Sequence, residues 1–366
     1  MSVDPSLRSG GPPTGEPPRP DSGGPTASSG GTSPQPGESP ATATAAAGQT
    51  AAIGPWKLAG RRLRRNKVAL VFMALFVLIV VLCLLAPVYS HDIAQIGPNQ
   101  GNPTGTIKVG GKTRNILSLQ GLPIGPTFTS HYFFGADTEG RDLAVRLLYG
   151  GRTSLEIGAI ATVIIMVFGT LIGLLTGYFR GWVDAILRPV MELIWSFPVV
   201  ILGVALGTAL ALGGIGPIHG NSILIPAFII GVIYIPYLGK PIRGEVLRLR
   251  EQDFVEAARV QGMGPWRIML SEILPNAAST IIVFLPLMLA YSILLEAYLS
   301  FLGAGVQPPN ASWGTLISDG LQYIDSTPFL SLIPGAMLVI AVLSINVLGD
   351  GVRDALDPRS QVRIKS

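Results

Sequence analysis

One short stretch decides how this chain is organised: Glu256-Ala257-Ala258-Arg259-Val260-Gln261-Gly262, followed at a distance by Ile273-Leu274-Pro275. The stretch predicts a small, alanine-faced helix that stops at a glycine. It lies in a basic loop between two segments that are apolar enough to span a membrane. A short helix that projects from a membrane protein can seat in a groove on a partner and carry that partner's movement into the membrane.

Composition places the chain in the membrane class. Its mean hydropathy is +0.49 and only 13% of its residues are charged. Although the net charge is +4, Lys and Arg fall mainly beside apolar runs rather than on one face, so we exclude nucleic acid as a partner. Cys83 is the single cysteine, which excludes an intrachain disulfide, and the three histidines show no metal-ligand spacing.

The N-terminal region has two parts. Residues 1–56 are nearly all Pro, Gly, Ser, Thr and Ala, which cannot bury enough apolar surface to offset the entropy of ordering, so we expect a disordered tail. Residues 57–88 combine a basic flank with the apolar run Val68–Pro87. This run is long enough to cross about 30 Å of hydrocarbon, too long for a secretory signal, and closed by no cleavage site, so it predicts a first transmembrane helix.

The distribution of charge sets the direction of the spans. Five further apolar segments follow, at Ile157–Phe179, Pro189–Leu212, Ile223–Gly239, Ala277–Ser300 and Phe329–Leu348. Basic residues gather in the N-terminal flank, in the loop 240–276 and in the tail 350–366, whereas the alternate short loops lack them. Because Lys and Arg favour the cytoplasmic side, we expect six transmembrane helices with both termini in the cytoplasm and a transmembrane core over residues 153–349.

The loop 89–152 must then lie outside the cytoplasm. It contains several Lys and Arg residues, but loops longer than about 60 residues count for little in the charge rule. Its Gly, Pro, Asn and Thr predict a small extracytoplasmic element with a hairpin or two. The apolar spacing of Asp142–Leu155 predicts an amphipathic helix at the membrane surface.

Glycines and prolines interrupt several spans, and we expect them to mark a moving, multi-helix core rather than a simple anchor. They are Gly169, Gly173, Pro198, Pro226, Pro236 and Pro286.

The loop 240–276 predicts two short helices joined by a tight turn. Asp253 stands three residues before Glu256, as in a capping box that starts a helix. Ala257 and Ala258 have minimal side chains, so another surface can approach the backbone closely. Gly262 is placed to end this helix in a left-handed conformation, and Pro265 fits the first turn of the next. The alternative is an ordinary helical hairpin without a partner.

These residues resemble the signature loop of the permease subunits of bacterial ATP-binding-cassette importers. The sequence departs from the family pattern at one position: Glu272 stands where the pattern has Ile, and Ile273 comes one residue later. This shift resembles the dipeptide, oligopeptide and nickel branch of the family, in its second, C-type permease subunit. Three further stretches resemble the same branch: Phe134-Gly135-Ala136-Asp137-Thr138-Glu139-Gly140-Arg141-Asp142, Leu299-Ser300-Phe301-Leu302-Gly303-Ala304-Gly305-Val306-Gln307-Pro308-Pro309, and the run from Asn346 to Arg359.

The resemblance implies an all-α integral membrane protein with the type I importer permease fold, in the inner membrane of a bacterium. It implies that Asp253, Glu256, Ala257, Ala258 and Gly262 dock on a cytoplasmic ATPase. The expected partners are a second permease subunit, two ATP-binding subunits, an extracytoplasmic substrate-binding protein and the lipid bilayer. The chain itself holds no cofactor in this interpretation, and ATP and Mg²⁺ are bound by the partner subunits.

The sequence contains no phosphate-binding loop of its own. Gly111-Lys112-Thr113 follows Gly105 with one residue too many between the first glycine and Gly-Lys. We therefore expect a non-catalytic subunit whose energy comes from a partner.

Three residues are candidates for the substrate path. Glu192 and Glu296 lie within apolar spans, where a charge is costly unless it faces the bundle interior or water. The alternative for both residues is a structural role. For Glu192 the nearby charge is Arg188, about one helical turn away. Trp195, together with Tyr234 and Tyr237, could line the same path, or these aromatic residues could act as interfacial anchors.

The sequence thus predicts a permease that forms half of a translocation path for di- or oligopeptides, with nickel or another small solute as the alternative substrate. Two other classes remain open. An ion-coupled carrier would need ionisable residues at the bilayer midplane and inverted repeats. A non-transporting scaffold would need residues 1–55 for function.

Overall fold

A computed structural model describes residues 60–213 and 219–356. The bounds of the named elements are, in chain order, α2 Lys67–Leu84, α3 Ala86–Val88, η1 Tyr89–Ala94, β1 Thr106–Val109, β2 Lys112–Asn115, α4 Leu143–Ile164, η2 Ile165–Gly169, α5 Thr170–Tyr178, α6 Trp182–Ser196, α7 Val199–Gly213, α8 Leu224–Arg250, α9 Asp253–Val260, α10 Pro265–Ile268, η3 Met269–Ile273, α11 Leu274–Phe301, α12 Trp313–Leu321 and α13 Phe329–Leu356. The elements labelled η are short π-helical turns. The predicted disordered tail, residues 1–56, lies outside the described residues.

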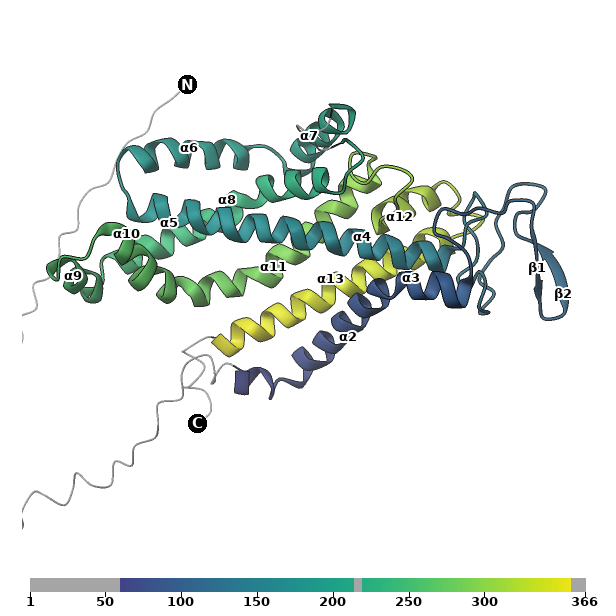
Figure 1. The fold of residues 1–366 in the computed structure, drawn as a ribbon, viewed down its shortest axis with the longest axis horizontal. Coiled ribbons are helices and arrows are strands. Elements are labelled where there is room, and N and C mark those ends of the chain that lie inside the picture. The colour runs from purple at the N-terminus through teal and green to yellow at the C-terminus, as the bar shows by residue number, and fades with distance from the viewer. Residues whose placement is uncertain (1–59, 214–218, 357–366) are drawn as a thin grey trace, which may run out of the picture. The chain divides into compact units, whose positions relative to one another are not determined.

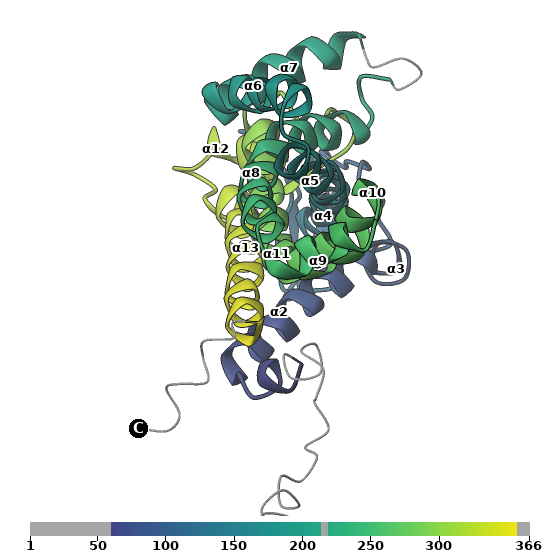
Figure 2. The same ribbon diagram turned by 90° about the vertical axis from the view of Figure 1, so that its left-hand side faces the viewer.

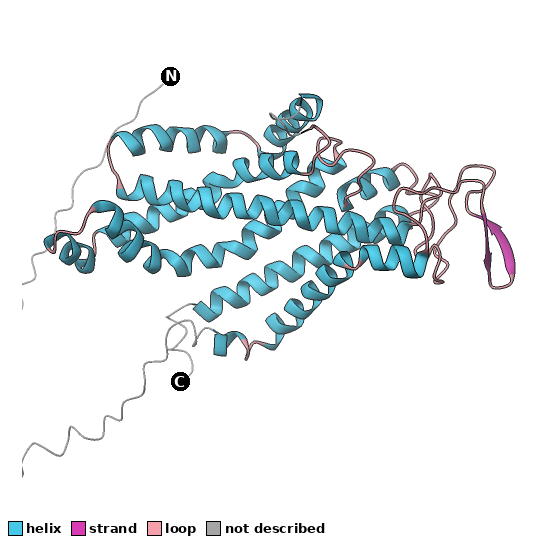
Figure 3. Ribbon diagram, in the orientation of Figure 1, coloured by secondary structure: helices cyan, strands magenta, loops and turns pink. Residues whose placement is uncertain are grey.

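The long helices form a bundle with α9 and α10 at one end and β1 and β2 at the other (Figure 1). Figure 2 shows the bundle from the side of α9 and α10. We call these ends the α9 end and the hairpin end. Figure 3 shows that the only sheet among the described residues stands at the hairpin end, beyond the helices. Because the basic stretch 240–276 and the loop 89–152 occupy opposite ends, the bundle has the two-sided organisation that a membrane-spanning protein requires.

Five continuous helical segments of the described chain are long and apolar enough to cross a membrane. Two of these segments join several elements: Leu143–Tyr178 comprises α4, η2 and α5 over 36 residues, and Pro265–Phe301 comprises α10, η3 and α11 over 37. The pair α6 and α7 also meets the requirement together but is bent by 94°. The six predicted spans are therefore found when the bent pair counts as one, in an all-α membrane fold.

The predicted third span, Pro189–Leu212, is not a straight helix. α6 ends at Ser196, Phe197 is extended with φ −85° and ψ 139°, and α7 begins at Val199. Pro198 explains the break, because proline removes a backbone donor and disfavours helical geometry in the residue before it.

The other prolines that were predicted to interrupt spans do not break them. Pro226 and Pro236 lie inside α8, and Pro286 lies inside α11, and both helices continue through them. Neighbouring helices and local adjustments satisfy the freed carbonyl groups in such positions. The prediction of a break is therefore correct only for Pro198.

The helix predicted over Asp142–Leu155 forms, but not as a separate amphipathic helix at the membrane surface. α4 begins at Leu143 and continues without interruption into the second span. Asp142 caps this helix, since its Oδ1 accepts hydrogen bonds from the N–H groups of Ala144 at 2.8 Å and Val145 at 3.2 Å. The apolar residues that suggested amphipathicity, such as Leu147, are buried against protein rather than turned towards lipid.

Close packing of α5 and its preceding turn on α8 depends on three glycines one helical turn apart: Gly169, Gly173 and Gly177. A Cβ atom at Gly173 would lie 2.7 Å from Cβ of Ile242 and 2.8 Å from the carbonyl oxygen of Gly239. Small residues in such an arrangement allow two helix backbones to approach within a membrane. Gly169 and Gly173, which the sequence assigned to a multi-helix core, thus lie at a contact between helices.

The hairpin end contains the predicted hairpin. β1 pairs with β2 antiparallel, from Thr106 opposite Asn115 to Val109 opposite Lys112. Gly110 and Gly111 form the turn with φ of 57° and 79°, the left-handed values that a two-residue type I′ turn requires at both positions. The Gly111-Lys112 pair is thus part of a hairpin turn.

The α9 end contains less loop than the sequence suggested. α8 does not stop near Gly239 but continues to Arg250. Two arginines fix this extension: Arg243 bonds Asp184 of α6, and Nη1 of Arg250 donates to the carbonyl of Tyr178 at 2.7 Å. The predicted loop 240–276 is therefore mostly helical. The short helix α9 is thereby connected to two long spans, α8 before it and the segment Pro265–Phe301 after it.

Candidate functional site

The helix α9 is the element that the sequence singled out, and its start differs from the prediction. Gln252 is the residue before the helix, in extended geometry with φ −86° and ψ 150°, and its side chain makes no capping hydrogen bond. Asp253 is the first helical residue, so the predicted capping box from Asp253 to Glu256 is wrong. Both carboxylates lie in the first turn, where they favour the helix through its dipole.

The end of α9 agrees with the prediction. Gly262 has φ +78°, the left-handed conformation. The N–H of Gly262 donates to the carbonyl of Arg259 at 2.9 Å, and the N–H of Met263 donates to the carbonyl of Ala258 at 3.1 Å. These two bonds are the pattern of a Schellman motif, which closes the free carbonyl groups at a helix end. Pro265 then opens α10, as predicted.

α9 has an inner and an outer face. Val255 and Ala258 are buried in the main hydrophobic core, whereas Glu256, Ala257 and Val260 are exposed, with Val260 at 84%. Of the two alanines that the sequence offered to a partner, Ala257 is therefore available and Ala258 fixes the helix to the bundle. The outer face combines a carboxylate, a methyl group and an exposed apolar side chain.

Contacts on both sides make α9 part of a rigid assembly. Glu251, just before α9, lies 3.1 Å from Nη2 of Arg180 in the turn after α5. Trp266, just after it, packs on Phe179 with ring centroids 5.2 Å apart. From Pro265 the chain runs through η3 directly into α11. Only short turns, residues 251–252 and 261–264, separate α9 from α8 and from the segment that continues into α11.

The three residues proposed for the substrate path occupy different environments. Glu192 is exposed on α6, and its Oε1 accepts a hydrogen bond from Nε of Arg188 at 2.8 Å. The two residues form an ion pair between positions one helical turn apart. This arrangement favours the structural alternative for Glu192. Trp195 instead packs on Tyr237, with ring centroids 4.1 Å apart, and Nζ of Lys240 lies 4.4 Å from the Trp195 ring.

Glu296 is fully buried near the hairpin end. Its Oε1 accepts from Oγ of Ser300 at 2.6 Å, and Oγ of Ser300 accepts from the N–H of Val306 at 3.0 Å. The Oε2 atom has no hydrogen-bond partner among the described residues. The geometry places Glu296 beside the turn that follows α11 and gives it no contact with an open cavity, which favours its structural alternative.

The structure joins Tyr234 and Tyr237, which the sequence offered beside Trp195, to Tyr291, which the sequence did not assign. Tyr237 contacts Tyr234 edge-on with centroids 5.0 Å apart, and Tyr234 stacks on Tyr291 at 6.0 Å. With Trp195 and Lys240 these rings form what we call the aromatic strip, which crosses α6, α8 and α11. Only contact between separate helices brings it together, so no local sequence pattern announces it.

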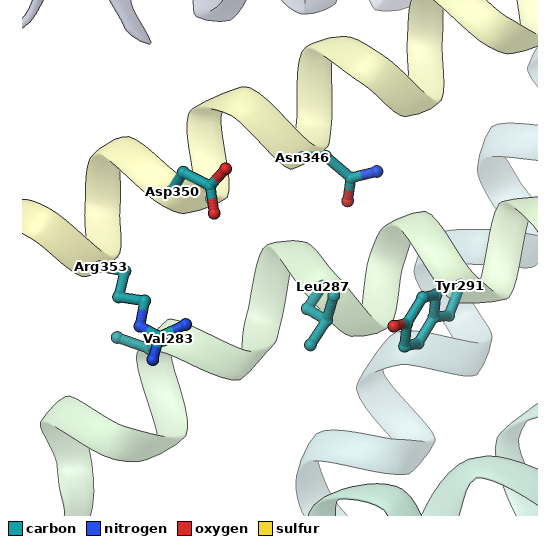
Figure 4. A pocket seen from close by; sticks show the side chains of 7 residues that line it. Val283, Leu287, Tyr291, Asn346, Asp350 and Arg353 are labelled. Atoms are coloured by element: carbon teal, nitrogen blue, oxygen red, sulfur yellow. The ribbon is translucent and has the colours of Figure 1, made fainter.

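The aromatic strip ends at a groove between α11 and α13 with a volume of about 320 Å³. Figure 4 shows Tyr291 and Leu287 of α11 on one side and Asn346, Asp350 and Arg353 of α13 on the other. The three polar residues recur at helical spacing in the run from Asn346 to Arg359 that was quoted for its resemblance. This spacing was the signal that could have predicted a polar face on the last span.

Comparison with protein families assigns the chain to a class of membrane transport component. Residues 169–362 match the family described as binding-protein-dependent transport system inner membrane component. Residues 54–103 match the N-terminal transmembrane domain of oligopeptide transport permease C. The chain belongs to the family of binding-protein-dependent transport system inner membrane components.

Individual relatives cover most of the chain. It is 34% identical over 308 residues to the dipeptide transport system permease protein DppC of Alkalihalophilus pseudofirmus, covering 84% of this chain and 91% of the relative. It is also 34% identical over 306 residues to the oligopeptide transport system permease protein OppC of Escherichia coli, covering 84% and 92%. A chain of the methionine ABC transporter MetNI in an inward-facing conformation matches with a TM-score of 0.48 and 19% identity, covering 58% of this chain and 96% of that one.

Membership of this family makes the chain a multi-pass permease subunit of an ABC importer, an inner membrane component. It decides against the ion-coupled carrier and the non-transporting scaffold that the sequence alone left open.

Proposed function

We propose that this chain forms half of the translocation path of an ATP-driven importer for di- or oligopeptides. The observation that carries this proposal is the outer face of α9, a rigidly mounted short helix that exposes Glu256, Ala257 and Val260 at one end of a six-span bundle. The peptide class is supported by relatives that are dipeptide and oligopeptide transport permeases. Nickel or another small solute is the competing substrate.

The α9 end faces the cytoplasm in this proposal, with both termini on the same side. The support is the charge rule: Arg248, Arg250, Arg259 and Arg267 surround α9, and a basic flank precedes α2. The hairpin end then faces outward, where a substrate-binding protein delivers its cargo.

The partners are a second permease subunit and two cytoplasmic ATPases, one of which grips α9. ATP and Mg²⁺ are bound by these ATPases and not by this chain. When ATP closes the pair of ATPases, α9 moves with the subunit that holds it, and its rigid links to α8 and α11 tilt the spans. The path thereby changes from inward-open to outward-open, and hydrolysis resets it.

The aromatic strip lines this chain's half of the path. Trp195, Tyr237, Tyr234 and Tyr291 offer ring edges and hydroxyl groups that suit the alternating amide and side-chain surface of a peptide. Polar groups within membrane spans face a cavity or a partner rather than lipid. Trp195 is thus the one of the three earlier candidates that remains on the path.

Reconstitution tests the function. The complete complex with its binding protein is placed in liposomes, and uptake of a labelled dipeptide, a labelled tripeptide and Ni²⁺ is measured with ATP inside or outside the lumen. We expect peptide uptake only when ATP reaches the ATPases. Uptake driven by an ion gradient without ATP, or uptake of Ni²⁺ alone, would contradict the proposal.

Labelling of single cysteines tests the orientation. Because Cys83 is buried and is the single native cysteine, a cysteine introduced at Lys112 in the hairpin or at Gln261 after α9 can be labelled selectively. An impermeant maleimide should label the Lys112 site in intact spheroplasts and the Gln261 site only after permeabilisation. The reverse pattern would show that the α9 end lies outside the cytoplasm and would contradict the proposed orientation.

A further inference from the structure

A pocket at the hairpin end joins two of the quoted stretches to which the proposed function gives no role. Its walls come from the stretch with Glu139 and Arg141, from the turn after α11 and from α12, and its volume is about 260 Å³. It shares no residue with α9 or with the aromatic strip. Two segments more than 150 residues apart in sequence meet there.

Two donor atoms of a buried cation at the wall of this pocket have no hydrogen-bond partner among the described residues. Only 4% of the Arg146 side chain is exposed, and its Nε and Nη1 atoms have no partner among the described residues. Nε stands 3.5 Å from Oδ2 of Asp137, and Nη2 stands 3.9 Å from Oδ2 of Asp319. A buried donor without an acceptor costs free energy, so an acceptor that enters the pocket would supply a bond that the protein withholds.

Asp137 gives Arg146 only a long ion-pair contact, because it is already engaged more closely by its own stretch. Its Oδ1 already accepts from the N–H groups of Glu139 and Arg141, each at 2.9 Å, and its Oδ2 accepts from Nε of Arg141 at 2.6 Å. Arg141 also bonds Glu139 through Nη1 at 2.7 Å. The acidic stretch thus bonds Arg141 closely and holds Arg146 only through the 3.5 Å ion pair with Asp137.

The exposed charge at the mouth of the pocket is negative. The side chains of Glu139 and Asp319 are 66% and 57% exposed, whereas those of Arg141 and Arg146 are 14% and 4% exposed. Three carboxylates, including that of Asp137, surround two guanidinium groups, so the cluster carries one net negative charge. An arriving group therefore meets two carboxylates first and the donors of Arg146 behind them.

The chemistry of a suitable ligand follows from these two facts. A carboxylate would suit Arg146 but would be repelled by Asp319 and Glu139. A lone ammonium would suit the carboxylates but would leave Arg146 without an acceptor. The amino-terminal end of a peptide satisfies both, because its α-ammonium group is followed directly by a carbonyl oxygen.

We propose that this pocket binds the amino-terminal end of the peptide substrate, with the α-ammonium group at Asp319 and Glu139 and the first carbonyl oxygen at Arg146. The pocket would then be a receiving site for peptide at the outer side of the permease. This inference rests on the proposed function, since it requires a peptide substrate and an outward-facing hairpin end.

Peptide binding to the complete permease–ATPase complex in nanodiscs, without the binding protein, tests the inference. Trialanine and N-acetyl-trialanine serve as probes, and calorimetry measures their affinities. Because a hydrogen bond to a charged group is lost, we expect N-acetyl-trialanine to bind at least tenfold more weakly than trialanine. In Asp319→Asn the preference for trialanine should shrink, because only Glu139 is left to pair with the ammonium group. Asp325→Asn, which removes an exposed carboxylate outside the pocket, should retain the wild-type preference.

Several results would overturn the inference. Equal binding of the two probes by the wild type, or an unchanged preference in Asp319→Asn, would show that the pocket does not read the ammonium group. If the complex transports trialanine but does not bind it without the binding protein, the pocket is not a receiving site for peptide. If Asp319→Asn weakens only the docking of the binding protein, the pocket belongs to that interface instead. A wild-type complex that transports no peptide would refute the proposed function itself.

Discussion

Arg243 of α8 donates two hydrogen bonds to Asp184 of α6, from Nε to Oδ1 and from Nη2 to Oδ2, each at 2.8 Å. Such a two-pronged contact fixes both distance and orientation. The pair is about four-fifths buried, with 24% and 19% of the two side chains exposed. It ties the first half of the bent span to the helix that leads into α9, so α6 moves with α8.

Breaking this pair should loosen the α9 end. Arg243→Lys keeps the charge but loses the paired geometry, and we expect a loss of about 1 kcal/mol in stability, seen as a lower Tm of the complex in detergent. Arg248→Lys is the matched control, since its pair with Glu245 is one turn long and mostly exposed on the arginine side. An equal loss in the two variants would contradict a specific role for the Arg243–Asp184 pair.

Gly262→Val should uncouple transport from ATP hydrolysis. Valine is strained at φ +78°, so the Schellman motif would distort and the outer face of α9 would turn. Gly264→Val is the control in the same loop, because Gly264 has φ −68° and ψ 154°, which valine adopts readily. Peptide uptake and ATPase activity are measured together. Wild-type uptake by a well-expressed Gly262→Val complex would contradict the role assigned to this turn.

Gly173→Ala should destabilise the bundle by roughly 1–3 kcal/mol, because the added methyl group overlaps Ile242 and the backbone of α8. Gly335→Ala should instead stabilise the bundle, because nothing lies within 4 Å of an added Cβ there. Alanine favours a helix over glycine by up to about 1 kcal/mol. Thermal unfolding of the two variants measures this contrast. Similar shifts in the two would mean that α5 and α8 do not pack as described.

Glu296→Gln should leave the KM for peptide near the wild-type value, because the amide oxygen can still accept from Ser300 and the side chain contacts no open cavity. Glu296→Ala should lower the yield of folded complex, since Ser300 loses its acceptor and a cavity remains. A raised KM in Glu296→Gln with normal expression would return Glu296 to the substrate path.

The sequence predicts the periodic and local features of this fold well. Apolar runs place the spans, Gly262 places the end of α9, and Pro265 places the start of α10, because each depends on length or on one residue's backbone preference. The predictions that failed depended on contacts outside the local stretch. Leu147 looked like one side of a surface helix but is buried in the bundle. Lys240–Arg250 looked like a loop until the partners of Arg243 on α6 and of Arg250 on α5 were known.

The candidate site divides in the same way. The outer face of α9 follows from one short stretch, whereas the aromatic strip requires Trp195, Tyr237 and Tyr291 to meet from three helices. Nothing in the sequence around Arg146 predicts that its donors will be buried close to the exposed carboxylates of Glu139 and Asp319. Such features become visible only when tertiary packing is known.

The contact between α9 and an ATPase is the central claim, and site-specific crosslinking tests it most directly. Ala257 is replaced by the photoreactive residue benzoylphenylalanine in the assembled complex, and the same residue replaces Lys112 of the hairpin as the control. We predict that illumination links the Ala257 site to an ATP-binding subunit and the Lys112 site to none. No link from Ala257 in an active complex, or a link to the extracytoplasmic binding protein, would contradict the account.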